Sequence, residues 1–410
     1  MNGPGHMREL TRGRYYNKIM GANTVLEYLD EVIGEQASKD NLRGQALTMR
    51  GWYYFLLVNL FGLPYNYGDP TENMGVPLKL KMEITGSYYR RNSVAEVYEQ
   101  IEKDLLDGIN LLENNPIVMS EYKINALAAK SILSRVYLYM ENWDGVLRYT
   151  NEVLAEKSEL TALASADEAA FVWQGSNAFG VYNMTTSNEV IWLYSNMGET
   201  STFYTAGSFN YRAPFGVSDD LMDLYEFEND TEKKNFKDLR PFLYFSTSAY
   251  FLQGLPVYYQ LYGCKCGKQS LTIGTKGIRT AELYLNRAEA YTRKFIALGD
   301  DNDRKLALAD LNNLRRHRYD TRNVAYEPKD YRNGSDLLEF CKEERRRELC
   351  FEDHRWFDLR RYGMPSFTHT YFINTDNKEV ITLTEEDPRY VLPIPKLALD
   401  RNPLLIQNKR

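Results

Sequence analysis

Apolar residues recur at helical spacing in the first part of the chain. The spacing predicts one helix over 15–32 and a second over 39–61. The second helix is expected to end at Gly62, because Pro64 follows two residues later and cannot continue it. A further helix is predicted to begin at Ser93, since this capping residue has a glutamate three positions on and precedes the next apolar run.

Two stretches, 125–156 and 281–318, each predict a pair of helices with alanine at the positions of closest contact. Such pairs are typical of tetratricopeptide repeats. A charged helix is predicted to run from Ser335 and to end at Gly363. The Pro-rich, apolar tail from Tyr390 is expected to be extended. The chain is therefore predicted to be mostly α-helical.

Residues 160–275 break the helical pattern. They are rich in Gly, Ser, Thr, Asn and aromatic residues, and only 189–194 predicts a short strand, with Trp192 in the core. Long irregular segments in a helical domain are usually functional or disordered, and this one is too aromatic to be disordered. The pattern gives a helical scaffold over 1–159, an irregular ligand region over 160–275, and helix pairs with a tail over 276–410.

Composition narrows the functional classes. The chain has 410 residues, 43% of them hydrophobic and 26% charged, with a net charge of -6. This profile is that of an ordinary globular protein, and the mild acidity argues against a nucleic-acid partner. With 4 His and 4 Cys at spacings that fit no zinc site, and no phosphate-binding loop, neither a metal nor a cofactor is predicted.

Tyrosine is unusually frequent, with 32 residues. A tyrosine ring can stack on the apolar face of a sugar while its hydroxyl group binds a polar atom. The irregular region places Trp173, Tyr204 and Tyr211 beside small polar residues, and Tyr67 lies in a Pro/Gly/Tyr-rich connection over 63–92. These four side chains are the candidate ligand contacts, and the competing interpretation is that any one of them belongs to the core.

The densest group of charges lies in the charged helix and comprises Glu344, Arg347, Glu348, Glu352, Arg355 and Asp358. One interpretation is a glycosidase pair, Glu348 with Glu352 or Asp358. The favoured interpretation is a structural ion-pair network, because abundant arginine lowers the pKa of a carboxyl group, whereas a catalytic acid needs a raised one. Pairs such as Glu344 with Arg347, or Glu348 with Arg355, fit helical spacing.

In combination, several segments resemble the SusD/RagB family of outer-membrane nutrient-binding lipoproteins. They follow the family's order over nearly the whole chain and comprise 43–64, 91–105, 126–153, 282–290, 344–360, 392–395 and 402–408. Asp353 departs from the family pattern, which usually has glycine there. The family's lipidated N-terminal Cys and first helical segment are also missing, so a truncated chain is expected.

The resemblance implies one SusD-like domain over 1–410, in which tetratricopeptide-like helix pairs form a right-handed scaffold and irregular loops with short strands carry the ligand site. It also implies a non-catalytic, surface-exposed lipoprotein of the outer membrane in a Bacteroidetes-type bacterium. Such a protein captures oligo- or polysaccharide for a SusC-like TonB-dependent transporter. The family's charged C-terminal motif is structural, which agrees with the ion-pair interpretation.

Three alternatives remain open from the sequence. A RagB-like protein would bind peptides, which calls for exposed backbone partners or a charged clamp rather than stacking rings. A glycosidase would use the carboxylates of the charged motif. A helical-repeat scaffold that binds only proteins would place its aromatic residues along concave helix faces rather than in the middle loops.

Overall fold

The computed structural model describes residues 4–82, 86–117, 120–171, 179–193, 216–228, 235–252, 255–263, 265, 277–372 and 377–410. The described chain is mostly helical, as predicted, with a few short strands. It forms two compact units. The first unit comprises 1–120, 124–142 and 356–410, and the second unit comprises 121–123 and 143–355. The tetratricopeptide-like arrangement and the single-domain organisation over 1–410 stay predictions.

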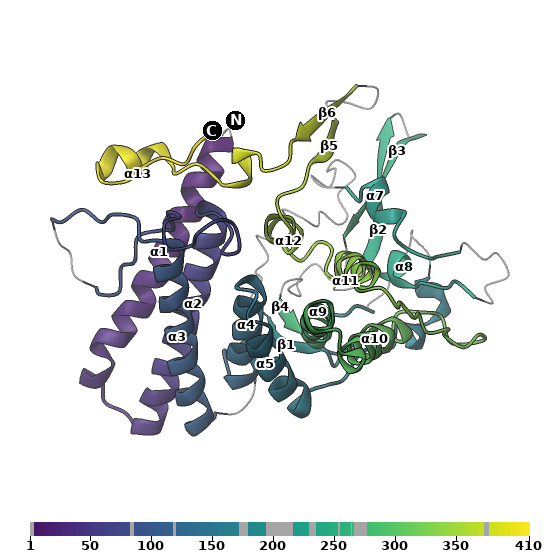
Figure 1. Cartoon of the computed structure of the whole chain (residues 1–410), viewed down its shortest axis with the longest axis horizontal. Coiled ribbons are helices and arrows are strands. Elements are labelled where there is room, and N and C mark those ends of the chain that lie inside the picture. Colours follow the sequence, from purple (N-terminus) through teal and green to yellow (C-terminus); the bar gives the residue numbers. More distant parts are fainter. Residues whose placement is uncertain are drawn as a thin grey trace. The chain divides into compact units, whose positions relative to one another are not determined.

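The first unit is built on four long helices, α1 (Pro4–Tyr28), α2 (Gln36–Phe61), α3 (Val94–Asn114) and α4 (Ala126–Tyr139). Helix α2 packs between α1 and α3, as Figure 1 shows. The backbones of α2 and α3 approach closely, because a Cβ atom on Gly108 would lie only 2.6 Å from the hydroxyl group of Thr48 and 3.1 Å from the carbonyl oxygen of Gly44. Glycine therefore sets the spacing of these two helices.

Local sequence signals explain the ends of these helices. Helix α2 ends at Phe61, and its predicted stop at Gly62 is confirmed. The Ser93 hydroxyl group accepts from the backbone N–H of Glu96, whose carboxylate accepts from the N–H of Ser93, so the predicted cap of α3 is confirmed. The helix predicted over 15–32 begins earlier, at Pro4, and passes into a 3-10 turn at Leu29–Glu31.

The C-terminal segment completes the first unit with α12 (Arg355–Arg361), the antiparallel hairpin of β5 (Phe367–Phe372) and β6 (Lys378–Leu383), and α13 (Lys396–Arg401). The prediction of a wholly extended tail was wrong at α13. Pro395 directly precedes this helix, where its fixed φ is tolerated, and the Lys-Leu-Ala-Leu run that follows favours helix.

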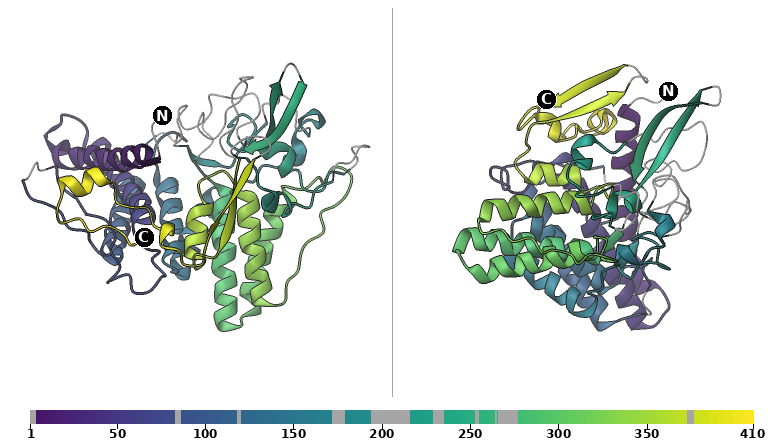
Figure 2. Two further views of the ribbon diagram at one scale, coloured as in Figure 1. Left: turned by 90° about the horizontal axis from the view of Figure 1, so that it is seen from above. Right: turned by 90° about the vertical axis from the view of Figure 1, so that its right-hand side faces the viewer.

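The second unit is organised around α9 (Thr280–Leu298), which contacts α5 (Trp143–Glu156), α10 (Asp301–Arg316) and α11 (Gly334–Glu348). Figure 2 shows α9, α10 and α11 side by side. Helix α9 ends at Leu298 and is capped by Gly299, which has the left-handed conformation with φ of 73°. The Asp300 carboxylate caps α10 by accepting from the N–H of Asn302. The helix pair predicted over 281–318 is thus present.

Two short antiparallel sheets flank this helical layer. Strand β1 (Val190–Leu193) pairs with β4 (Gly277–Arg279), and β2 (Phe245–Leu252) pairs with β3 (Leu255–Gly263). The strand predicted over 189–194 is confirmed, and so is the core position of Trp192, which lies opposite Ile278 and is buried. The short helices α7 (Asp219–Met222) and α8 (Arg240–Tyr244) contribute to a hydrophobic core that also contains Val190 and Leu193 of β1.

The charged helix predicted from Ser335 to Gly363 is interrupted. Helix α11 ends at Glu348, and α12 begins only at Arg355. Between them, Phe351 and Asp353 adopt left-handed backbone conformations with φ of 59° and 64°. The left-handed conformation interrupts the helix, so residues on either side of it no longer share a helical face. Aspartate is one of the few residues with a side chain that tolerates this conformation. Glycine adopts this conformation without steric cost, so the position suits glycine as well as aspartate.

Candidate functional site

Of the predicted ligand contacts, only Tyr67 belongs to the described residues. Trp173, Tyr204 and Tyr211 lie outside them, as do Cys264 and Cys266. The described parts of the irregular region supply a different feature, a group of charged side chains inside the second unit. This group contains carboxylates of the charged motif, whereas Tyr67 lies in the first unit.

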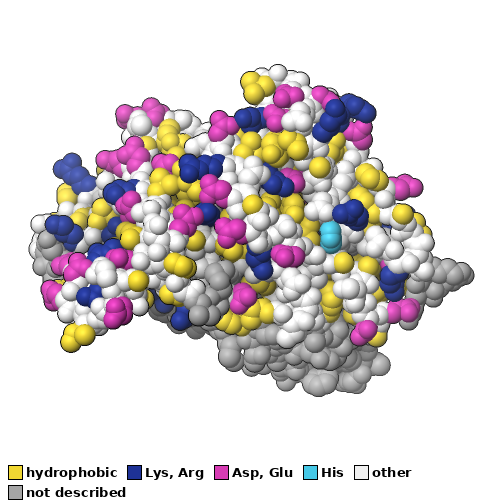
Figure 3. All heavy atoms as spheres, turned by 90° about the horizontal axis from the view of Figure 1, so that it is seen from below, with side chains coloured by type: hydrophobic (Ala, Val, Ile, Leu, Met, Phe, Trp, Pro, Cys, Tyr) yellow, Lys and Arg dark blue, Asp and Glu magenta, His cyan; other side chains and the backbone are white. Residues whose placement is uncertain are grey.

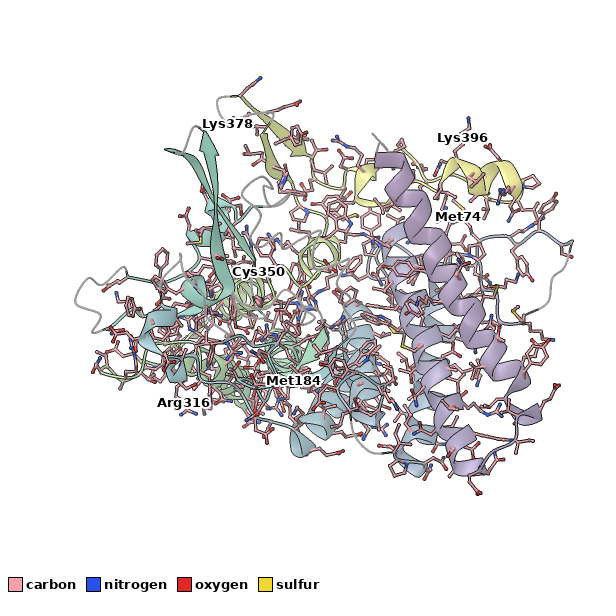
Figure 4. All side chains as sticks on the ribbon, turned by 180° about the vertical axis from the view of Figure 1, so that it is seen from behind. Met74, Met184, Arg316, Cys350, Lys378 and Lys396 are labelled. Atoms are coloured by element: carbon pink, nitrogen blue, oxygen red, sulfur yellow. The ribbon has the colours of Figure 1, made fainter. Side chains whose placement is uncertain are left out.

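Acidic and basic side chains from distant parts of the second unit meet in its interior and form what we call the buried charge cluster. Each member is at most 3% exposed, and they are Glu189, Asp238, Arg240, Lys265, Arg279, Arg315, Arg318, Glu344, Glu348 and Glu352. Figure 4 labels Cys350, which follows the end of α11. In the sequence it lies between Glu348 and Glu352, two members of the cluster. Burial of so many charges requires close pairing, because an unpaired buried charge is strongly unfavourable.

Glu348, the last residue of α11, is the centre of the cluster. Its carboxylate accepts hydrogen bonds from the guanidinium groups of Arg318 at 3.0 Å and Arg279 at 2.5 Å. Arg240 donates to it at 3.2 Å, and the Tyr244 hydroxyl group donates at 2.9 Å. Because these donors come from α8, from β4 and from the segment that follows α10, one carboxylate joins elements that are far apart in sequence.

The two neighbouring carboxylates extend the cluster on either side. Glu344, one helical turn earlier, accepts from Arg240 at 2.6 Å and from Arg315 at 2.7 Å. Glu352 lies past the end of the helix and accepts from Lys265 at 2.5 Å and from Arg279 at 2.8 Å. The carboxylates of the charged motif therefore fix Arg240 and Lys265. Parts of the chain between these two residues lie outside the described residues.

The electrostatics of the cluster argue against acid catalysis. Burial by itself disfavours ionisation of Glu348, but the guanidinium groups of Arg318 and Arg279 outweigh it and hold the pKa well below the ordinary glutamate value. The pKa of Glu344 and that of Glu352 are also lowered, again because neighbouring cations outweigh burial. A glycosidase acid must instead retain its proton near neutral pH, which requires a raised pKa.

Of the two ion pairs predicted within the charged motif, one is present and the other was wrong. Glu344 does pair with Arg347, at 2.8 Å. The pairing of Glu348 with Arg355 was wrong, because the chain turns away from helical spacing at Phe351 and Arg355 is exposed to solvent. Asp358 belongs to the first unit, where it pairs with Arg361 at 2.9 Å.

Single residues with reactive side chains also have structural surroundings in the second unit. His354 is buried, and its Nδ1 lies 3.2 Å from a guanidinium nitrogen of Arg345, which fits a structural role. Cys341 and Cys350 are free and buried. Within the described residues, no group of three or more His, Cys, Asp or Glu side chains could hold a metal ion.

Sequence reasoning missed the partners of the motif. Glu189, Asp238, Arg240, Lys265 and Arg279 stand singly in the sequence, with no spacing that connects them to α11. One signal was available, because Glu189 directly precedes an apolar run that was predicted to be a buried strand. A charge at the edge of such a strand requires an opposite charge elsewhere in the fold.

Tyr67 lies on the surface of the first unit. Its ring packs against a small core that contains Leu359, Met364 and Tyr390, and its hydroxyl group donates to the Glu386 carboxylate at 3.1 Å. This hydrogen bond is the main reason why the pKa of Tyr67 is raised. The ring is half-buried, so its orientation is fixed while part of its surface remains open to solvent.

The backbone beside Tyr67 is also held firmly. The Asn73 side chain donates to the carbonyl oxygen of Tyr67 at 2.6 Å. Asn66, which is exposed, donates to the Glu141 carboxylate at 2.8 Å and to the carbonyl oxygen of Arg361 at 2.9 Å. An aromatic ring next to fixed amide and carboxylate groups is the arrangement that suits a sugar, which offers both apolar C–H faces and hydroxyl groups.

Arg91 fixes the far end of the connection that carries Tyr67. Its guanidinium group donates to the carbonyl oxygens of Gly75 at 2.7 Å and Phe61 at 2.8 Å, and to the Asn408 side chain at 2.7 Å. Asn408 in turn donates to the carbonyl oxygens of Phe61 and Leu392. Arg91 and Asn408 thus join the exit of α2 to the C-terminal tail. They belong to two of the segments that carry the family resemblance, 91–105 and 402–408.

The surface carries charges of both signs. On the face in Figure 3, Lys and Arg side chains are interspersed with Asp and Glu rather than gathered into one patch. Among the described residues, none of the helices combines the length and the apolar character needed to cross a bilayer.

Comparison with known proteins identifies the class. A family model described as starch-binding and associating with the outer membrane, SusD-like, matches residues 10–138. The model of the SusD family matches residues 172–410. The chain therefore belongs to the SusD family. A search of curated proteins finds no match.

Solved structures agree with this assignment at the level of the fold. A SusD-like carbohydrate-binding protein from Bacteroides vulgatus is 22% identical, with a TM-score of 0.71 over 97% of this chain and 83% of that chain. A SusD superfamily protein from Bacteroides thetaiotaomicron is 24% identical, with a TM-score of 0.70 over 97% of this chain and 84% of that one. A SusD-like protein from Bacteroides fragilis is 19% identical, with a TM-score of 0.71, 98% of this chain and 86% of that chain being covered.

Proposed function

We propose that this protein is a non-catalytic glycan-binding lipoprotein of the outer membrane, which captures oligo- or polysaccharide at the cell surface and delivers it to a SusC-like TonB-dependent transporter. The observation that carries the proposal is the match of the SusD family model over 172–410, together with the SusD-like model over 10–138. The fold supports it, because solved structures described as SusD-like are similar over almost the whole chain.

The geometry supports capture rather than hydrolysis. The carboxylates that a glycosidase would use, Glu348 and Glu352, are buried, ionised and saturated with hydrogen bonds from arginine and lysine. Their hydrogen bonds stabilise the second unit and leave them ionised, without the proton that a catalytic acid must donate. Affinity would come instead from aromatic rings such as Tyr67, and selectivity from neighbouring polar groups. Shallow sites of this kind bind weakly unless several act together.

The proposed ligand contacts are Tyr67 together with Trp173, Tyr204 and Tyr211. For Tyr67, support comes from its fixed, half-buried ring and the exposed amide of Asn66 next to it. For the other three residues, support comes from the sequence alone. A peptide ligand is the alternative, and it would depend on exposed backbone partners rather than on rings.

Titration calorimetry of the purified chain with soluble polysaccharides, oligosaccharides and peptides tests this proposal, provided that each mixture is analysed afterwards for products. Binding of a glycan without cleavage is the expected result. Binding together with cleavage would establish an enzyme, and binding of peptides alone would establish the RagB-like alternative. The variant Glu348→Gln serves as the catalytic control, because loss of hydrolysis in a variant that still folds would contradict the structural role of this residue.

A further inference from the structure

Arg360 differs from the other buried arginines. Its side chain, on α12, is 2% exposed and donates through Nη2 to the carbonyl oxygen of Gly62. Its other two nitrogens, Nε and Nη1, are buried and have no hydrogen-bond partner among the described residues. Every arginine of the buried charge cluster has carboxylate partners, whereas the described residues supply none to Arg360.

The surroundings of Arg360 are aromatic. The hydroxyl groups of Tyr98 and Tyr139 are the titratable groups that act on its charge, and burial lowers its pKa to about 10 despite them. The rings of Phe55 and Tyr65 pack against Tyr98. Guanidinium remains protonated at neutral pH, so a full positive charge lies in an apolar environment, which is costly without a counter-charge.

Tyr98 supplies a further donor. Its hydroxyl oxygen accepts from the Asn59 side chain at 2.9 Å, so its own proton is directed elsewhere, and no acceptor for it is found in the described part of the chain. Tyr98 is 1% exposed. Both groups bind the C-terminal end of α2, because the Tyr98 hydroxyl group accepts from Asn59 and Arg360 donates to the carbonyl oxygen of Gly62, three residues later. The unpartnered Nε and Nη1 of Arg360, the Tyr98 hydroxyl proton and a positive charge therefore lie at the same end of this helix, and the described residues supply no acceptor to them.

We propose that Arg360 and Tyr98 bind a small monovalent inorganic anion of the size of chloride inside the first unit. The donors define the chemical class, because an acceptor that also carries negative charge satisfies them and compensates the guanidinium. The aromatic surroundings select a small ion with a low hydration cost over a multivalent one. Such an anion would stabilise the exit of α2 at Gly62, from which the connection that carries Tyr67 begins.

Chloride linkage to folding tests the proposal. Urea unfolding would be measured at constant ionic strength while sodium chloride replaces sodium gluconate, whose anion is much larger than chloride. Above the dissociation constant, the apparent unfolding equilibrium constant of the natural sequence should fall roughly tenfold for each tenfold rise in chloride. Arg360→Met and the nearly isosteric Tyr98→Phe should lose this dependence, and the exposed control Arg316→Gln should keep it.

Crystals grown in sodium bromide supply an independent readout that does not depend on variants. An anomalous peak within hydrogen-bond distance of the Arg360 guanidinium and the Tyr98 hydroxyl group is the expected result. If the natural sequence shows no chloride dependence, if the dependence survives in Tyr98→Phe, or if the site contains only water without anomalous signal, the proposal is wrong. Should Arg360→Met fail to fold, Tyr98→Phe and the bromide data decide the question.

Discussion

The guanidinium group of Arg91 donates a hydrogen bond of 2.7 Å to the side-chain oxygen of Asn408, which lies 317 residues further along the chain. The same guanidinium also binds the carbonyl oxygens of Phe61, Met74 and Gly75. The Arg91 side chain therefore connects three segments by hydrogen bonds, namely the exit of α2, the connection over 63–92 and the C-terminal tail.

Replacement of Arg91 by methionine should destabilise the first unit. The change leaves several backbone acceptors without donors, and hydrogen bonds to a charged group each contribute about 1.5–3 kcal/mol. We expect the free energy of unfolding to fall by about 3 kcal/mol, measured by urea denaturation. Arg90→Met, at the exposed neighbouring position, is the matched control and should change stability by less than about 0.5 kcal/mol. Equal effects of both changes would contradict the closing role of Arg91.

Glu348→Gln should destabilise the second unit strongly. The variant keeps the shape of the side chain but leaves the charges of Arg318, Arg279 and Arg240 without their common partner. Removal of one member of a buried ion pair typically costs about 3–5 kcal/mol. Glu339→Gln, on the exposed face of the same helix, is the control and should be nearly neutral. Urea midpoints of the two variants check this expectation, and a stable Glu348→Gln would refute it.

Acid should unfold the protein through the same cluster. The pKa values of Glu344, Glu348 and Glu352 are lower in the folded state than the ordinary value of 4.5. Their contribution to stability is therefore complete above about pH 4.5 and is lost as the pH falls toward the folded-state values. We expect a constant urea midpoint between about pH 5 and 7 and a steep decrease below about 4.5.

The acid transition should be shallower in Glu352→Gln, because this variant has one fewer carboxylate to protonate on unfolding. Urea midpoints measured at a series of pH values compare its slope with that of the natural sequence. An identical slope would show that Glu352 contributes nothing to the acid response.

Gly108→Ala should weaken the contact between α2 and α3. The added methyl group would overlap the Thr48 hydroxyl group and approach the carbonyl oxygen of Gly44, so the helices must move apart. Overpacking of this kind costs about 1–3 kcal/mol, even though alanine has the higher helix propensity. Gly21→Ala in α1 is the control, because a Cβ there meets nothing within 4 Å, and it should stabilise the protein slightly. Thermal denaturation of both variants separates the packing effect from the propensity effect.

Tyr67→Ala should weaken glycan binding roughly tenfold if the ring stacks on a sugar, whereas Tyr67→Phe should retain most of the affinity. The comparison isolates the ring from its hydroxyl group, which is already engaged by Glu386. Tyr371→Ala, which removes an exposed ring from β5, is the control. Calorimetric titration measures all three variants. A loss in Tyr67→Phe equal to that in Tyr67→Ala would assign the effect to the hydrogen bond instead of to stacking.

Local signals in the sequence predicted the parts of the fold that depend on local physics. The cap at Ser93, the stop at Gly62 and the strand around Trp192 are all present, because capping and periodicity act over a few residues. The break after Glu348 was missed, since Phe351 adopts a left-handed conformation that its own sequence does not favour and tertiary packing imposes.

The candidate site likewise combines features that local sequence predicts with features that only the fold creates. That the carboxylates of α11 are structural could be inferred from the arginines beside them, but Arg240, Arg279 and Lys265 reach them only through the fold. No spacing rule connects residues that lie so far apart in the sequence. The ligand aromatics remain predictions for a related reason, because irregular segments follow no periodicity from which the direction of a side chain could be inferred.

The contact between Arg91 and Asn408 also makes the first unit discontinuous in the sequence. The residues of the second unit lie between its two parts, so 356–410 can join α1, α2 and α3 only across 143–355. Contacts between residues so far apart must pay for closing a long loop before they stabilise anything, which makes them slow to form. We expect refolding of the first unit to be limited by the docking of 356–410, whereas most residues of the second unit belong to one continuous stretch.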